Sequence, residues 1–132
     1  MRLYDEQSRF TTGEFRCRCE CGFGSHEKDI DPTLIEKLNM LRRLYGKALV
    51  VVSGARCVEY NRSVGGVENS AHLPHSQTKQ CRAVDIYVVD SADRYTLVDY
   101  ALRIGFNRIG LAKTFLHLDV AWDLEKHIIF NY

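Results

Sequence analysis

Apolar residues recur at helical spacing in two stretches of the chain. In the first, positions three and four apart share one side of a predicted helix: Leu34, Ile35, Leu38, Leu41 and Leu44. Asp31 and Pro32 provide the cap and first residue of this helix, and Gly46 ends it. In the second, Ser91 is the predicted cap, Gly105 ends the helix, and the apolar side comprises Leu97, Val98, Ala101, Leu102 and Ile104.

Runs rich in β-branched and aromatic residues alternate with these helices. They predict strands at residues 48–52, 82–89, 108–111, 115–120 and 127–130. The first run is continuously apolar, which is typical of a buried strand, and the last is expected at a sheet edge. A short helix is predicted over residues 57–64, followed by a polar loop over 73–81. This order predicts an α+β fold, a single small domain over residues 1–132 with an antiparallel sheet and flanking helices.

Thiols and charges alternate between Phe15 and Phe23. Cys17, Cys19 and Cys21 occupy alternate positions, separated by charged residues. Because cysteine behaves as a small buried hydrophobe, this period of two favours a half-buried extended segment with its thiols inside. The alternative is a structural zinc site made of these three cysteines and one further ligand. A C-x-C-x-C run lacks the wider gap usual in zinc knuckles, so buried free thiols are the preferred interpretation.

Composition narrows the classes of function. The chain has 132 residues, 45% of them hydrophobic, and a formal net charge of +1, which gives no basic field for nucleic acid. No apolar run reaches the roughly 18 residues of a membrane span. The first ten residues lack the apolar segment of a secretory signal, and the odd number of cysteines argues against a disulfide framework. We therefore expect a monomer that is synthesised in the cytoplasm and binds neither nucleic acid nor membrane.

Histidines and aspartates gather in the second half of the chain. The candidate metal ligands are His72, His75, Asp85, His117 and Asp119. His117 and Asp119 fall on one face of the predicted strand at 115–120. Asp85 is a charge in an apolar run and, if buried, must be paired or bound to a metal. On spacing alone, ordinary loop and strand-end residues remain an equal alternative to a metal site.

Several of these residues belong to motifs that occur in order. They are Ser53-Gly54-Ala55-Arg56, Ser70-Ala71-His72, Arg82-Ala83-Val84-Asp85 and Phe115-Leu116-His117-Leu118-Asp119. Together they resemble the M15 family of zinc D-Ala-D-Ala peptidases, and especially its short branch in phage and bacterial peptidoglycan peptidases. The resemblance covers about residues 10–120. It implies the fold of the hedgehog and D-Ala-D-Ala peptidase group.

The resemblance also implies roles for individual residues. One catalytic Zn²⁺ would be held by His72, Asp85 and His117. Arg56 would bind a substrate carboxylate or stabilise the oxyanion, a task that suits a planar bidentate donor. Ser70 would help to shape the substrate pocket.

Two departures from the family pattern bear on the site. Twelve residues separate His72 from Asp85, where relatives usually have six, and the added loop carries His75 as a rival ligand or a substrate-binding residue on the rim. Thr114 stands three residues before His117, where many relatives have an acid that acts as the base. Asp119 is then the available catalytic carboxylate, and its alternative role is to orient His117.

The expected function is hydrolysis of peptidoglycan stem peptides. The bond could be that of a D-Ala-D-Ala carboxypeptidase or of an L-Ala-D-Glu-type endopeptidase, and a phage endolysin acting on the cell wall after release would fit. One alternative is a non-catalytic member of the fold that keeps the metal for binding or structure. Another is a cysteine-based metal or redox protein that uses the Cys17–Cys21 run.

Overall fold

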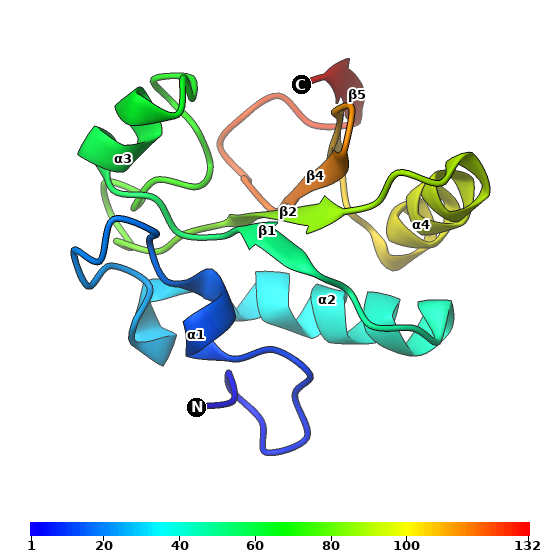
Figure 1. Ribbon diagram of the computed structural model, residues 1–132, viewed down its shortest axis with the longest axis horizontal. Helices are drawn as coiled ribbons and strands as arrows, with labels where there is room; N and C mark the ends of the chain where they lie inside the picture. The colour runs from blue at the N-terminus through cyan, green and yellow to red at the C-terminus, as the bar shows by residue number, and fades with distance from the viewer.

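A five-stranded sheet forms the centre of the molecule in the computed structural model, which describes residues 1–132 (Figure 1). The strands are β1 (Val51–Ser53), β2 (Ala83–Tyr87), β3 (Arg108–Leu111), β4 (Phe115–Asp119) and β5 (Ile128–Asn131). Their order in the sheet is β1-β2-β4-β3-β5. All neighbours are antiparallel except β3 and β5, which run parallel at one edge. The predicted α+β class and the edge position of the last strand are confirmed.

Four α-helices and one 3-10 helix surround this sheet. They are α1 (Thr12–Phe15), η1 (Glu27–Asp29), α2 (Pro32–Tyr45), α3 (Val58–Ser63) and α4 (Ser91–Ile104). Helix α2 begins and ends as predicted, because Asp31 accepts the Thr33 N–H at 2.8 Å and Gly46 adopts a φ of 76°. No helix combines the length and the apolar character needed to cross a bilayer.

Helix α4 differs from the prediction in two details. Its cap is Asp90, whose carboxylate accepts the Asp93 N–H at 2.9 Å, and Ser91 is the first helical residue. Leu97 and Ala101 are buried as expected, but Leu102 is 51% exposed. Leu102 follows Ala101 directly, so it lies about 100° further round the helix, away from the core.

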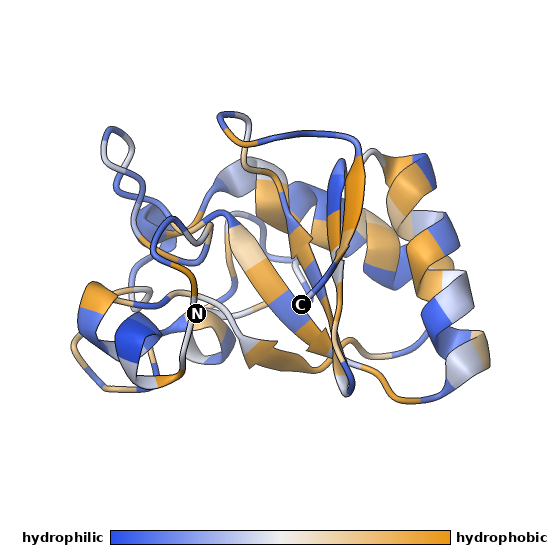
Figure 2. Cartoon of the chain, turned by 90° about the horizontal axis from the view of Figure 1, so that it is seen from above, coloured by the Kyte–Doolittle hydropathy of each residue, from blue (hydrophilic) through white to orange (hydrophobic).

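The two faces of the sheet have different tasks. Leu116 and Leu118 of β4 and Ile86 of β2 are buried in the same core as helices α2 and α4. Because strand side chains alternate, His117 of β4 and Asp85 of β2 point to the opposite face. Figure 2 shows this alternation of hydrophobic and hydrophilic positions along the central strands. The helical layer therefore supplies the core and leaves the other face for polar chemistry.

Two extended segments were predicted wrongly. Strand β1 is shorter than the predicted run at 48–52 and lies at the sheet edge, so Val50 and Val52 are 57% and 43% exposed. The segment 15–23 is not a strand, because α1 ends at Phe15 and turns follow it. Cys19 and Cys21 are exposed there, which contradicts the prediction that all three thiols of this run are buried.

Candidate metal centre and cavity

His72, Asp85 and His117 come together on the polar face of the sheet. Strand pairing puts Asp85 of β2 directly opposite His117 of β4, and the loop after α3 brings in His72. Asp85 Oδ1 lies 3.2 Å from His72 Nε2 and 3.0 Å from His117 Nδ1. The three residues are buried, with exposed fractions between 0% and 3%.

The donor set fits a zinc ion. Ligand bonds of about 2.0–2.2 Å arranged tetrahedrally put the ligand atoms roughly 3.3–3.6 Å apart, close to the observed separations. The three ligand atoms lie within 4.8 Å of one another. Two imidazole nitrogens and one carboxylate oxygen leave a fourth position for water or substrate, as in catalytic zinc sites.

The surroundings of His72 also indicate a cation. Its Nδ1–H donates to the Gly54 carbonyl at 2.6 Å, so the Nε2 lone pair faces Asp85. Burial lowers the pKa of His72 and so favours the neutral ring, in which two acceptors face each other across 3.2 Å. A metal ion between them would satisfy both. Glycine is needed at position 54 because a Cβ there would lie 2.7 Å from the Phe15 ring.

A hydrogen-bonded chain holds the His117 ring. Asp119 Oδ2 lies 2.6 Å from His117 Nε2, and Asp119 Oδ1 accepts the Ala121 N–H at 3.0 Å. Arg108, opposite Asp119 in the strand register, donates its Nε–H to both carboxylate oxygens at 2.9 and 3.2 Å. The Asp119 side chain has no exposed surface. A carboxylate bound to the far nitrogen of a histidine fixes the tautomer and orientation of a metal ligand.

The protonation equilibria of the group are coupled. Burial alone would raise the pKa of Asp85, but His72 and His117 outweigh it and hold that pKa well below its usual range. Burial would lower the pKa of His117, but hydrogen bonds to Asp119 and Asp85 raise it instead. In the metal-free chain a proton therefore favours His117. A cation bound at Nδ1 would replace that proton.

Arg56 lies beside this group, on the short segment that follows β1. It is 5% exposed and donates to Asp85 Oδ2 at 3.0 Å. Its other partners are Ser53 Oγ at 3.0 Å, Asn61 Oδ1 at 3.1 Å and Tyr132 Oη at 3.4 Å. These contacts use four of the five guanidinium N–H groups. Arg56 thus orients Asp85 and retains one N–H for another acceptor.

Asp85 and His117 line a cavity of about 730 Å³, whereas His72 is fully buried. Its apolar lining residues include Phe115, Leu124, Ile128, Phe130 and Tyr132. Polar lining residues include Arg56, Asn69, Ser70, Arg108 and Glu125. Ser70 also accepts the His72 N–H at 3.2 Å, which ties the ligand loop to the cavity wall. A space of this size, with apolar lining residues and a few convergent polar groups, suits a small ligand.

The structure does not bring His75 to the cavity. Its Nε2–H donates to Asp123 Oδ2 at 2.9 Å, its Nδ1 accepts the Gln77 N–H at 3.2 Å, and its ring packs on Trp122. The prediction of His75 as a ligand or rim residue therefore has no support in its position. The added loop folds away and closes where the Arg82 N–H donates to the Ala71 carbonyl at 2.9 Å. This closure keeps His72 beside Asp85 despite the longer spacing.

Three cavity residues were not predicted from the sequence. Arg108 could have been found, because pairing the predicted strands at 108–111 and 115–120 puts a cation opposite Asp119. Glu125 and Tyr132 had no signal, since they depend on the course of the chain after β4. Tyr132 stacks on the His117 ring at 4.9 Å with an interplanar angle of 24°.

The fold and the site define a class: a small α+β domain with a buried His-Asp-His group that could hold a metal ion beside a cavity. The family model described as Peptidase M15 matches residues 8–119. The chain therefore belongs to the peptidase M15 family, and this membership supports the assignment of the protein as a hydrolase. A search of curated proteins finds no match to this chain.

Proposed function

We propose that the chain is a zinc peptidase that hydrolyses peptide bonds in peptidoglycan stem peptides. The observation that carries this proposal is the buried group of His72, Asp85 and His117, of which Asp85 and His117 line a cavity of about 730 Å³. Membership of the peptidase M15 family supports the same reaction class. Action on the cell wall after release from the cytoplasm, as in phage lysis, forms part of the proposal.

Each residue of the centre has a distinct part in the proposed reaction. His72 would bind the metal through Nε2, His117 through Nδ1, and Asp85 through Oδ1. Zinc held there would lower the pKa of a bound water and polarise the scissile carbonyl. Asp119 would keep the proton of His117 on Nε2, so that Nδ1 stays free for the metal.

Two arginines could recognise the carboxylates of a stem peptide. Arg56 has one N–H left after its four contacts, which suits a single bond to a carboxylate or to the developing oxyanion. Arg108 donates through Nε and Nη1, and its Nη2 has no protein partner. The Ser70 hydroxyl accepts the His72 N–H and keeps its own O–H to donate to a substrate.

The geometry favours Asp119 as a positioning residue over Asp119 as the general base. All of its hydrogen bonds go to His117, Arg108 and Ala121, and the side chain has no exposed surface. Glu125 lines the same cavity, is exposed, and has no side-chain partner. It is the free carboxylate on this wall and therefore our candidate for the base that Thr114 cannot supply.

Digestion of purified peptidoglycan, read by mass spectrometry, tests the proposal. The zinc-loaded chain should release new peptides, and a chelator or His117→Ala should abolish them, whereas the exposed His26→Ala should not. Loss of a terminal D-Ala identifies a carboxypeptidase, and an internal cut identifies an endopeptidase. If the zinc-loaded chain cleaves no chemotype of peptidoglycan, the enzymatic proposal is wrong.

The second candidate is a non-catalytic member of the fold that keeps the metal for binding. Thr114 at the usual acid position favours it, together with the full engagement of Asp119. Under this alternative, Glu125→Gln changes nothing measurable. Under the peptidase proposal it should lower kcat by roughly 10²–10⁴-fold, the usual contribution of a general base.

A further inference from the structure

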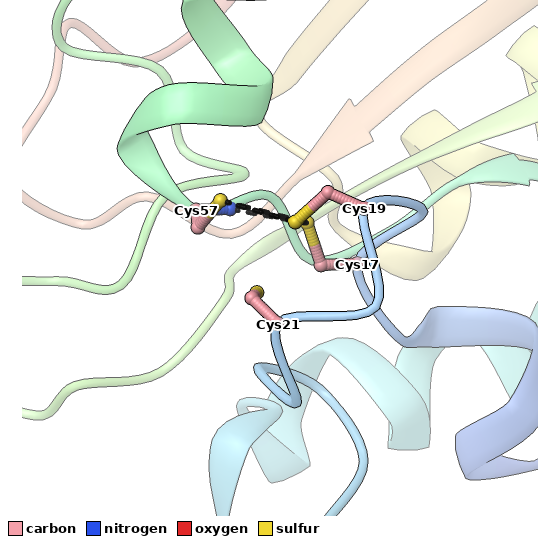
Figure 3. A group of neighbouring side chains, drawn as sticks. All are labelled: Cys17, Cys19, Cys21 and Cys57. Carbon is pink, nitrogen blue, oxygen red and sulfur yellow. Dashed lines mark hydrogen bonds between the residues drawn. The ribbon is translucent and has the colours of Figure 1, made fainter.

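Four cysteines outside the cavity meet at one point. Cys17, Cys19 and Cys21 lie on the turns after α1, and Cys57 caps α3, some 40 residues further along the chain. Figure 3 shows the side chains of the turn and of the helix start pointing toward a common centre. All four sulfur atoms lie within 4.8 Å of one another. Because Cys19 and Cys21 are exposed, packing in the hydrophobic core does not explain why the four thiols converge.

The sulfur separations match a metal centre rather than disulfides. The distances are 3.4 Å from Cys17 to Cys19, 3.5 Å from Cys19 to Cys57, and 3.8 Å from Cys17 to Cys57. Four thiolates at about 2.3 Å from a tetrahedral zinc ion lie roughly 3.8 Å apart. A disulfide needs about 2.05 Å and pairs sulfurs two by two, whereas three of these sulfurs are mutually close.

Backbone N–H groups already support negative charge on the sulfurs. The Cys57 N–H donates to Cys17 Sγ at 3.4 Å, and the Tyr60 N–H donates to Cys57 Sγ at 3.4 Å. Although burial opposes it, hydrogen bonds from the Cys19 and Cys57 backbones lower the pKa of Cys17. The hydrogen bond with Cys17, followed by those with Cys21 and Cys57, raises the pKa of Cys19 to about 12. The two backbone N–H donors would also stabilise thiolate ligands of a cation bound between the sulfurs.

We propose that Cys17, Cys19, Cys21 and Cys57 bind a second zinc ion, with a structural role. Four soft thiolates in a tetrahedral arrangement select zinc and leave no open position for catalysis. Binding releases the remaining thiol protons to solvent. Cys19 and Cys21 are exposed, which gives the ion a path to the site.

The second zinc would attach the turns of residues 17–23 to the wall of the cavity. Cys57 follows Arg56 directly, and the Arg56 guanidinium lies 3.0 Å from Asp85 Oδ2. On the other side, the Cys17 N–H donates to the Phe23 carbonyl at 2.8 Å, which closes the turn that carries the thiols. The ion would thus hold Arg56 in place through its neighbour in the chain. The evidence for the cysteine site does not rest on the proposed peptidase activity, so either proposal can fail alone.

Metal analysis of the full chain tests this inference. The zinc-loaded protein should contain two zinc ions per chain, one for each group of ligands. Cys21→Ser, an exposed position, should reduce this to one, and His117→Ala should independently do the same. Cys81→Ser is the matched control, because Cys81 lies outside the cluster and donates to the Ala83 carbonyl. It should leave the zinc content unchanged.

Cobalt substitution gives a readout on the unmodified chain. Co²⁺ in the cysteine cluster should produce an intense thiolate-to-cobalt charge-transfer band, which a centre of histidine and aspartate cannot give. The band should persist in His117→Ala and be lost or strongly reduced in Cys21→Ser. A single zinc per chain that Cys21→Ser leaves in place, cobalt without the charge-transfer band, or a mass showing oxidised disulfides in the freshly reduced and zinc-loaded protein would each overturn the inference.

Discussion

Replacing Asp119 with asparagine separates the positioning of His117 from general-base catalysis. Asp119 Oδ2 accepts from His117 and Oδ1 from the Ala121 N–H, and the Arg108 Nε–H donates to both oxygens. An asparagine has one acceptor and one donor, so its NH₂ group must face His117 or the other two donors. If it faces His117, the proton moves to Nδ1, the atom that points at Asp85. If it faces the other side, buried donors oppose each other.

The cost of this change follows from the contacts. Losing the partner of a metal-bound histidine lowers metal affinity by about 10–100-fold. That loss corresponds to about 1.4–2.8 kcal/mol of binding free energy. Alanine at the same position would leave the Arg108 guanidinium, 13% exposed, without its anion. Breaking a buried ion pair costs about 3–5 kcal/mol of folding free energy, so asparagine is the cleaner probe.

Two measurements on Asp119→Asn decide the question. Zinc affinity is measured by competition with a chromophoric chelator, and the hydrolysis rate is measured at saturating zinc. A positioning role predicts weakened affinity and a largely recovered rate. A base predicts unchanged affinity and a rate lower by roughly 10²–10⁴-fold. Unchanged zinc affinity would refute the positioning role, and Glu125→Gln, which removes the same charge from the cavity wall, is the control that should bind zinc normally.

Three further outcomes are expected. The pKa of Asp85 is lowered in the folded chain, so its contribution to stability is complete above the unfolded value of 3.8 and is lost as the pH falls through the folded value. Acid unfolding of the metal-free chain, followed by circular dichroism, should therefore begin below that value and not above it. Gly66→Ala would place a Cβ 2.0 Å from Asn61 Oδ1 and should cost about 1–3 kcal/mol in urea unfolding. Gly13→Ala, with its nearest atom at 3.8 Å, should cost far less. His75→Ala should leave the zinc content unchanged and remove about 1 kcal/mol of stability with the Asp123 hydrogen bond, and a lost zinc would show that His75 is a ligand.

The sequence predicts correctly those elements whose caps, ends and apolar sides lie within one short stretch of the chain. Helix α2 has its cap, its stop and its apolar side within one stretch of sequence, and the structure confirms all three. The alternation around Cys19 predicted a strand, but Glu20 and Gly22 adopt positive φ values of 65° and 96° and turn the chain. These turns place the thiols opposite Cys57, which lies about 40 residues further along the chain. The local pattern of residues 15–23 does not include Cys57, so it could not predict this cluster.

For the same reason, the sequence predicted the ligand group of His72, Asp85 and His117 but not the cluster that Cys57 completes. Within four consecutive residues, the Gly54 carbonyl fixes His72, the Arg56 guanidinium fixes Asp85, and Cys57 contributes its thiol to the cysteine cluster. This segment is therefore the physical link between the two centres. Because one peptide bond joins Cys57 to Arg56, a displacement of Cys57 would also move Arg56, whose guanidinium is hydrogen-bonded to Asp85. We expect the cysteine cluster to influence zinc affinity at the other centre through the placement of Arg56, without contacting the cavity itself.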